Sequence, residues 1–201
     1  MKLLYAAGWT YVVLALAITY RATRTDAMMP PEPAYAPVLP VPAAPLAPAP
    51  AVSWYDRIRP HCNPVEVEVA IRSNPVPDNF TGQASAAACY ALAGKIERAT
   101  QYIDGLPEER RAEAASIVFA AGHPVADAGD DEAAGPIMEL VVRYIPNHYM
   151  ALYHAGIAQF RTGELAAAER NLEAFLQHYN SKDGWTQNAQ ETLRSIRRGA
   201  R

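Results

Sequence analysis

The sequence predicts an all-α protein: a short α-solenoid of about three helical hairpins plus a C-terminal capping helix, preceded by a transmembrane helix and a proline-rich linker. Three observations predict this arrangement. Apolar residues recur at helical spacing in two stripes through Tyr149–Tyr179. The same small residues return at offsets of 34 and 35 residues toward the N-terminus. A charge-free apolar run and a proline-rich stretch occupy the start of the chain, and neither fits a packed core.

The composition fits a globular helical domain with additional segments. The chain has 201 residues, a net charge of -3 and a pI near 6.0, so it lacks the basic footprint of a nucleic-acid-binding protein. Hydrophobic residues make up 50%, a share raised by alanine, and charged residues make up 19%. The sequence contains no nucleophile elbow, phosphate-binding loop or zinc-protease motif. We therefore predict that the protein is not an enzyme and needs no cofactor.

The first element is a predicted membrane anchor over residues 1–22. Leu3 to Tyr20 carry no charge, and as a helix they span about 27 Å, close to the thickness of a bilayer core. The alternative is a cleaved signal peptide with a small-residue site at residues 34–36. The anchor is favoured because Arg21 and Arg24 follow the apolar run directly, whereas the small-residue site lies far downstream.

Residues 23–53 are predicted to form a disordered linker rich in proline and alanine. Pro30 to Pro50 hold nine of the seventeen prolines, and such a stretch forms an extended spacer of roughly 65 Å. The alternative is a proline-rich ligand for an aromatic-lined groove. A long spacer lifts a domain away from a membrane surface, which favours a folded part outside the cytoplasm.

The charges that flank the anchor leave its orientation nearly undecided. Lys2 and the amino terminus oppose Arg21 and Arg24, so the positive-inside count is close to a tie. The expected orientation therefore depends on the spacer and on the cysteine pair described below. We expect a single-pass protein of the inner membrane with an extracytoplasmic C-terminal domain; the bacterial assignment rests on the alanine- and proline-rich composition.

Residues 54–79 are predicted to form a segment that precedes the repeats. Trp54, Tyr55 and Ile58 suit a short helical face that ends at Pro60. Residues 63–66 then form a helix start, with asparagine as the cap, proline in the first turn and glutamate three residues after the cap. The sequence VEVEVAI that follows alternates as a strand does. We favour a helix because no partner strand is visible.

The two cysteines, Cys62 and Cys89, can form one disulfide if the domain lies in an oxidising compartment. The bridge would tie the segment before the repeats to the first repeat. The alternative is that both are small buried residues that never meet. No Cys/His spacing in the chain indicates a zinc site.

The hairpin at residues 147–180 resembles a tetratricopeptide repeat, a helix-turn-helix unit of 34 residues. Four features carry the resemblance: Gly156 in the first helix, Gly163-Glu164 at the turn, Ala168 at the crossing, and an aromatic-apolar second helix. Two positions depart from the family pattern, which has an aromatic residue in place of Leu152 and a proline in place of Asn180.

The period extends the resemblance to two earlier units. Unit 2, residues 108–146, has counterparts at the 34-residue offset in Gly122, Gly129, Ala134 and Met138. Unit 1, residues 80–107, has Gly94, Ala99 and Ile103. Unit 2 is degenerate, because Pro124 is expected to end its first helix early and HPVADAGDD to form a long loop. Residues 183–198 are expected to form a capping helix with a polar outer face.

The acidic loop of unit 2 contains residues that commonly bind metals, but their spacing does not match a known metal-binding loop. His123, Asp127, Asp130, Asp131 and Glu132 can in principle supply nitrogen and oxygen ligands. The expected role of Asp130 and Asp131 is to cap and begin the next helix. His148 and His154 are six residues apart, which puts them on different faces of a helix. We therefore predict no metal site.

The tetratricopeptide resemblance implies that first helices line a concave surface that holds a protein or peptide. At the matching positions stand Ala88, Leu92, Phe119, His123, Tyr153, Ile157 and Arg161. The alternative role of Tyr153 and Ile157 is packing against the terminal helix. The function that follows is a membrane-tethered interaction module, scaffold or adaptor at a bacterial envelope. The alternative is an accessory structural subunit of a membrane protein complex.

Overall fold

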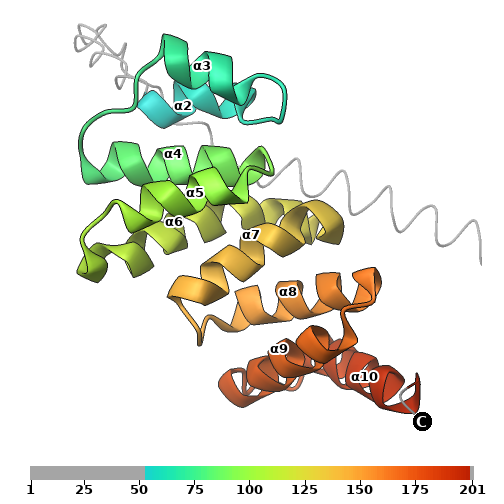
Figure 1. The fold of residues 1–201 in the computed structure, drawn as a ribbon. Helices are drawn as coiled ribbons and strands as arrows, with labels where there is room; N and C mark the ends of the chain where they lie inside the picture. Colours follow the sequence, from blue (N-terminus) through green and yellow to red (C-terminus); the bar gives the residue numbers. More distant parts are fainter. Residues whose placement is uncertain (1–52, 200–201) are drawn as a thin grey trace, which may run out of the picture. The chain divides into compact units, whose positions relative to one another are not determined.

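The computed structural model describes residues 53–199, and this part of the chain is helical throughout, with no strand. The predicted anchor and all but the last residue of the predicted linker lie outside the described residues. None of the described helices is long and apolar enough to cross a membrane. In the numbering of Figure 1 the elements are α2 (Trp54–Ile58), a 3₁₀ turn (Arg59–His61), α3 (Val67–Ser73), α4 (Phe80–Leu92), α5 (Ile96–Asp104), α6 (Glu108–Asp127), α7 (Asp131–Tyr144), α8 (Tyr149–Thr162), α9 (Leu165–His178) and α10 (Gly184–Gly199).

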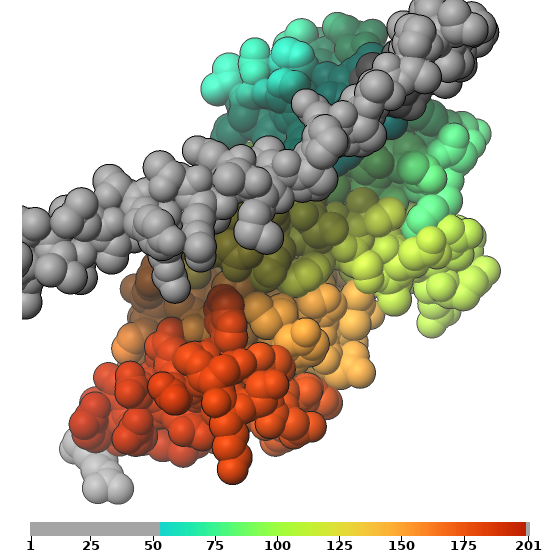
Figure 2. Space-filling view, turned by 180° about the vertical axis from the view of Figure 1, so that it is seen from behind, coloured from blue at the N-terminus to red at the C-terminus, as the bar shows by residue number. Residues whose placement is uncertain are grey.

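The helices from α4 onward stack in the order of the sequence. Each of α4 to α9 packs against its neighbour in the chain, and α4 also packs broadly against α6. Helix α7 lies between α6 and α8, and α10 closes the stack against α9 and α8 (Figure 1). The same order is visible from behind, where the colours run from the first described helices to α10 (Figure 2).

The segment before the stack is helical although part of its sequence alternates as a strand does. Ser53 and Asp56 form a capping box at the start of α2, and the Asn63 side chain accepts the N–H groups of Val65 and Glu66 at 3.1 and 3.0 Å. In α3 the side chains of Val67 and Ile71 are buried, whereas Val69 is 63% exposed. The apolar face therefore repeats every four residues, so this segment is a helix and not a strand. The expected helix start at residues 63–66 is wrong, because these residues form a turn and α3 begins at Val67 without a side-chain cap.

A disulfide joins Cys62, which follows the 3₁₀ turn, to Cys89 in α4. Both cysteines are buried, at 9% and 0% exposure, in the main hydrophobic core. The bridge links residues 27 apart in the sequence. It therefore fastens the segment before the stack to the first helix of the stack.

Helices α4, α6 and α8 end in the same way, on a glycine in the left-handed region. Gly94, Gly129 and Gly163 have φ values of 69°, 84° and 84°, which a residue with a Cβ adopts only with strain. After each glycine, the next N–H donates to the carbonyl five residues earlier; the pairs are Lys95 to Tyr90, Asp130 to Val125, and Glu164 to Gln159. The chain therefore reverses after each of these helices within a few residues.

The α6–α7 and α8–α9 crossings depend on the absence of a side chain at glycine. A Cβ at Gly122 would lie 2.6 Å from Ile137 Cγ2, and one at Gly156 would lie 2.7 Å from Leu172 Cγ. Ile137 and Leu172 are themselves buried. These contacts bring α6 close to α7 and α8 close to α9.

The expectation that Pro124 ends the first helix of unit 2 is wrong, because α6 continues to Asp127. Proline removes the N–H that would donate to the carbonyl of Ala120, but Ala120 is exposed, so water can satisfy that carbonyl. The carbonyl of Pro124 still accepts the N–H of Ala128, and Ala126 packs at 5% exposure. The expected long loop is consequently reduced to the three residues 128–130.

The C-terminal helix α10 has the buried face and the polar outer face expected of a capping helix. Ala189, Leu193 and Ile196 are buried, and Trp185 is half-buried. Ala189, Leu193 and Trp185 join a core cluster with residues of α8 and α9, among them Tyr153 and Phe175. The outer side of α10 carries exposed Gln187, Gln190, Glu191, Arg194 and Arg197.

Replacing Gly156 by alanine is expected to destabilise the full-length protein by about 1 to 3 kcal/mol, because the new Cβ overpacks the α8–α9 crossing. Alanine favours a helix over glycine by about 1 kcal/mol, so without the clash the sign would be the opposite. Thermal unfolding followed by circular dichroism measures the effect. Gly184→Ala is the matched control, since no described atom lies within 4 Å of its Cβ position. A Gly156→Ala protein as stable as the control would contradict the close crossing.

Candidate functional site

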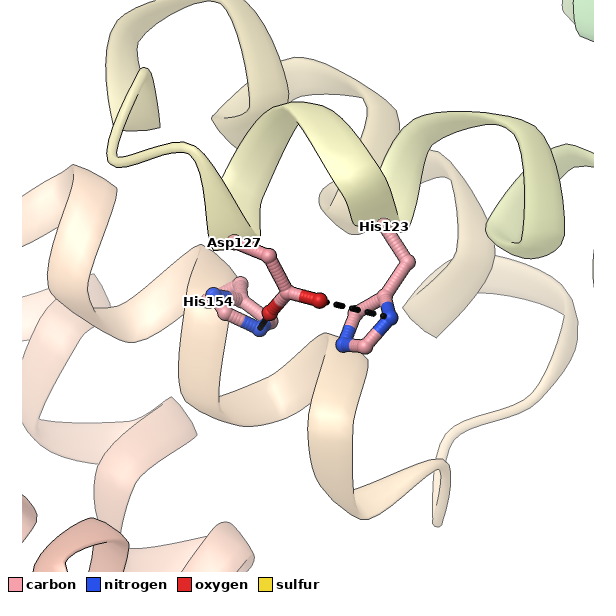
Figure 3. Close-up of side chains that lie close together, drawn as sticks. All are labelled: His123, Asp127 and His154. Atoms are coloured by element: carbon pink, nitrogen blue, oxygen red, sulfur yellow. Dashed lines mark ion pairs between the residues drawn. The ribbon is translucent and has the colours of Figure 1, made fainter.

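Two histidines and an aspartate come together where α6 ends beside α8. His123 and Asp127 lie one turn apart on α6, and His154 comes from the middle of α8 (Figure 3). His123 Nδ1 lies 3.5 Å from one carboxylate oxygen of Asp127, and His154 Nε2 lies 3.9 Å from the other. One side-chain ligand atom from each residue lies within 4.8 Å of those of the other two. We call these three residues the histidine–aspartate cluster.

The three side chains of the cluster differ in their exposure to solvent. The His154 side chain is 3% exposed, that of His123 28% and that of Asp127 48%. Within the described part of the chain, the Nε2 atoms of both histidines are buried and have no hydrogen-bond partner. A buried polar atom without a partner costs about 1 to 3 kcal/mol. The cluster therefore has unused polar capacity directed at a partly open site.

Burial sets the protonation of His154. Loss of water around the ring, followed by repulsion from His123, lowers the pKa of His154 to about 4, and Asp127 opposes the shift. Burial also lowers the pKa of His148, which lies near His123. At neutral pH His154 is consequently uncharged, and one of its ring nitrogens carries a free lone pair.

Aromatic rings surround the histidines on both sides. The ring of Phe119 stacks on His123 with centroids 4.7 Å apart and contacts His148 at 4.1 Å. On the other side Trp185 of α10 meets the His154 ring edge-on at 5.6 Å. The terminal helix therefore forms part of the wall around the cluster, and the histidine rings are held in fixed positions.

A groove opens beside the cluster along α8, and we call it the α8 groove. It has a volume of about 490 Å³. Its walls come from the end of α6, the start of α7, α8 and α10, and include Asp127, Tyr153, His154, Arg161, Trp185 and Asn188. The Asn188 side chain donates a hydrogen bond of 2.6 Å to the Tyr153 hydroxyl, which ties α10 to α8 across the groove.

An ion pair between Arg161 and Asp131 also lines the groove. The Asp131 side chain is 7% exposed, whereas that of Arg161 is 59% exposed. Burial raises the pKa of Asp131, and Arg161 opposes that rise. The Arg161 guanidinium also donates to the Gly129 carbonyl at 3.3 Å. Arg161 thus neutralises a buried carboxylate and still presents charge to solvent.

Arg161→Ala is expected to destabilise the protein by about 1 to 2 kcal/mol at pH 7, because Asp131 is left buried without its partner. The loss should shrink near pH 4, where Asp131 with its raised pKa takes up a proton. Chemical denaturation at the two pH values measures the difference. The double variant Arg161→Ala/Asp131→Asn is the control, and its loss should not depend on pH in this way. An Arg161→Ala loss of equal size at both pH values would argue against the pair.

The seven residues expected on a concave surface lie in different environments. Ala88 is fully buried in α4 and therefore packs inside the stack. Leu92 is half-buried against the main core. Phe119 and His123 are half-buried at the cluster. Tyr153, Ile157 and Arg161 line the α8 groove, although Tyr153 and Ile157 are only 5% and 8% exposed and also belong to the core beneath α10.

The acidic loop of unit 2 does not form a ligand cluster of its own. Asp130 accepts the N–H of Ala133 at 3.1 Å and caps α7, as expected. Asp131 pairs with Arg161, and Glu132 is exposed. Of the candidate ligands in the loop only His123 and Asp127 meet, and the third member is His154 from another helix.

Sequence reasoning missed His154 and Trp185 as site residues. His154 follows His123 by 31 residues, which is one helical turn short of the 34-residue period. Residues related in this way face each other when one unit stacks on the next with an offset of a turn. That spacing was the available signal for His154. Trp185 belongs to α10, outside the period, and carried no such signal.

No protein-family model, no curated protein and no solved structure matches this chain. The resemblance to a tetratricopeptide repeat consequently depends on the residues of this chain and their geometry.

Proposed function

We propose that the protein is a membrane-tethered helical-repeat module of the tetratricopeptide type, and that it binds a segment of a partner protein in the α8 groove at a bacterial envelope. The observation that carries the proposal is the groove itself. It is lined by side chains from four helices, it holds exposed charge at Asp127 and Arg161, and it has aromatic walls at Tyr153 and Trp185.

The repeat assignment is supported by positions that recur at the period. Helices α4, α6 and α8 share their glycine ends. In the helices that follow them, the equivalent positions are all fully buried: Ala99, Ala134 and Ala168 in one row, and Ile103, Met138 and Leu172 one turn later. Equal burial at equal spacing is expected when each unit stacks on the next by the same contacts.

The tether and the compartment are supported by two separate features. The apolar run from Leu3 to Tyr20 has the length of a membrane span. The bridge between Cys62 and Cys89 suits an oxidising compartment, because cytosolic thiols are kept reduced. We infer an inner-membrane anchor with the repeats on the extracytoplasmic side. A reporter fused after Arg201 that is active only in the cytoplasm would exclude this orientation.

The chemistry of the groove indicates a polar partner segment with an apolar anchor. The exposed guanidinium of Arg161 can donate hydrogen bonds to a carboxylate of the partner segment. The carboxylate of Asp127 can accept a hydrogen bond from a basic group of that segment. Trp185 is half-buried and offers part of its ring to an apolar side chain, whereas Tyr153 is only 5% exposed.

The proposal is tested by blocking the groove in the tagged full-length protein. Asn188→Arg places a long side chain at the groove wall, whereas Gln190→Arg adds the same charge on the outer face of α10. Each protein is purified from membranes in mild detergent, and its co-purifying proteins are compared. We expect a partner that is retained by wild type and Gln190→Arg and lost from Asn188→Arg.

The outcomes separate the proposal from its alternative. A salt-sensitive partner that depends on the groove supports the adaptor. Stoichiometric co-purification that survives Asn188→Arg instead indicates an accessory subunit of a membrane complex, held by another surface. Absence of any specific partner in all three preparations would also reject the proposal.

A further inference from the structure

We propose that His123, Asp127 and His154 form a binding site for one divalent transition-metal ion, with Zn²⁺ as the ion. This site shares Asp127 and His154 with the lining of the α8 groove, but metal binding does not require a partner segment. Two imidazoles and a carboxylate converge from two helices, and their ligand atoms all lie within 4.8 Å of one another (Figure 3). Nothing in the helical stack requires these three side chains to meet.

The separations approach those around an ion held at bonding distance. Tetrahedral zinc with bonds of about 2.0 to 2.2 Å keeps its ligand atoms roughly 3.3 Å apart. The two nitrogen–oxygen separations in the cluster are 3.5 and 3.9 Å, each to a different oxygen of Asp127, and all chosen ligand atoms lie within 4.8 Å of one another, so the ligands must move closer to bind an ion. The Asp127 side chain is 48% exposed and free to turn toward the ion, whereas His154 is fixed by its burial. The site therefore closes by rotation of its exposed carboxylate.

The unused ring nitrogen of His154 is a second and independent indication. Within residues 53–199, the His154 side chain is only 3% exposed, and its Nε2 atom has no hydrogen-bond partner. His123 approaches Asp127 through Nδ1, so this indication comes from His154 alone. A fold that needed only packing at this position would favour an apolar residue, because an unpaired buried nitrogen is costly. A metal ion satisfies such a lone pair directly.

The donor set selects the class of metal. Imidazole ligands suit zinc, copper, nickel and iron, whereas magnesium and calcium take oxygen ligands almost exclusively. The cluster contains no thiolate, since both cysteines form the disulfide, so copper(I) and iron–sulfur groups are not favoured. Three protein ligands leave a fourth position open on the side of the α8 groove, where water or a ligand atom of a bound segment can enter.

The surrounding rings preserve the geometry of the site. Phe119 stacks on the His123 ring and Trp185 meets the edge of the His154 ring. These contacts limit rotation of the two imidazoles, which lowers the cost of ordering them on metal binding.

The test is a zinc titration of the full-length protein, purified in detergent with a tag that contains no histidine and stripped with a chelator. Competition with a chromophoric zinc indicator gives the stoichiometry and affinity, and Co²⁺ gives a visible absorption band that reports on the ligands. We expect one Zn²⁺ per chain, no competition from Mg²⁺, and an unfolding midpoint that rises with zinc concentration.

Three variants locate the binding. His154→Gln and Asp127→Asn should each lower zinc affinity by about 100-fold or more, since changes in the outer shell alone cost 10- to 100-fold. Asp127 is exposed, so Asp127→Asn is expected to keep the fold, as circular dichroism will show, even if His154→Gln does not. His178→Gln removes an exposed histidine far from the cluster in sequence and should bind as wild type does.

Absence of stoichiometric zinc binding by the wild-type chain would overturn the proposal. Wild-type affinity in Asp127→Asn would overturn it as well, and so would an equal loss in His178→Gln, because both results place the ion elsewhere.

Discussion

Reduction of the Cys62–Cys89 bridge is expected to lower the free energy of unfolding by about 3.5 kcal/mol. The bridge closes a loop between residues 27 apart, and the chain-entropy relation gives this value at 25 °C for a loop of that length. For a domain of this size the loss corresponds to roughly 10 °C in the unfolding midpoint. Calorimetry or circular dichroism of the full-length protein with and without reductant measures it.

The double variant Cys62→Ala/Cys89→Ala is the control for this prediction. It should unfold near the midpoint of the reduced wild type, and added reductant should leave it unchanged. Peptide mass spectrometry under non-reducing conditions establishes the bridge in the starting material. If protein with a proven bridge unfolds at the same temperature after reduction, the segment before the stack is held by its packing alone.

Acidification from pH 7 to pH 4 is expected to cost the metal-free protein about 3 kcal/mol through His154 alone. Burial lowers the pKa of His154 to about 4 in the folded state, whereas an unfolded histidine titrates near 6.5. Between these values the unfolded chain binds the additional proton, so stability is full above about pH 6.5 and falls as the pH drops toward 4. The groups that face His154 are His123 and Asp127 of α6, and α10 contributes the uncharged Trp185.

Denaturant unfolding of chelator-treated protein across this pH range measures the loss. His154→Gln cannot take up the proton, so its stability should fall less than that of wild type over the same interval. His178→Gln is the matched control and should follow the wild type, since its histidine is exposed. Parallel pH profiles for wild type and His154→Gln would show that the His154 ring is not buried as described.

The helices of the stack were predictable because their signals are local. Apolar spacing and the glycine that ends each first helix act within a few residues, so α8 and α9 follow from their own sequence. Helix α3 was expected because no partner strand is visible in the sequence, but its start was not, since Asn63 closes the turn at Val65 and Glu66 and the helix begins at Val67. The apolar face of α10 was visible for the same reason.

Features that depend on tertiary packing, or on contacts between residues distant in the sequence, were not predicted correctly. Pro124 has the local signal of a helix end, but the exposed carbonyl of Ala120 and the packing of Ala126 allow α6 to continue. The histidine–aspartate cluster joins residues that lie 31 positions apart, between His123 and His154. A sequence shows such a meeting only if the offset between stacked helices is known. The role of Trp185 depends on where the terminal helix docks, which no local pattern encodes.

In-cell photocrosslinking tests most directly whether the α8 groove holds a partner protein. A photoreactive amino acid replaces Asn188 in the groove in one full-length protein and Gln190 on the outer face of α10 in another. We predict that irradiation yields a discrete protein adduct from position 188 and none from position 190. Adducts of the same size from both positions, or from position 190 alone, would contradict the assignment of the groove as the binding surface.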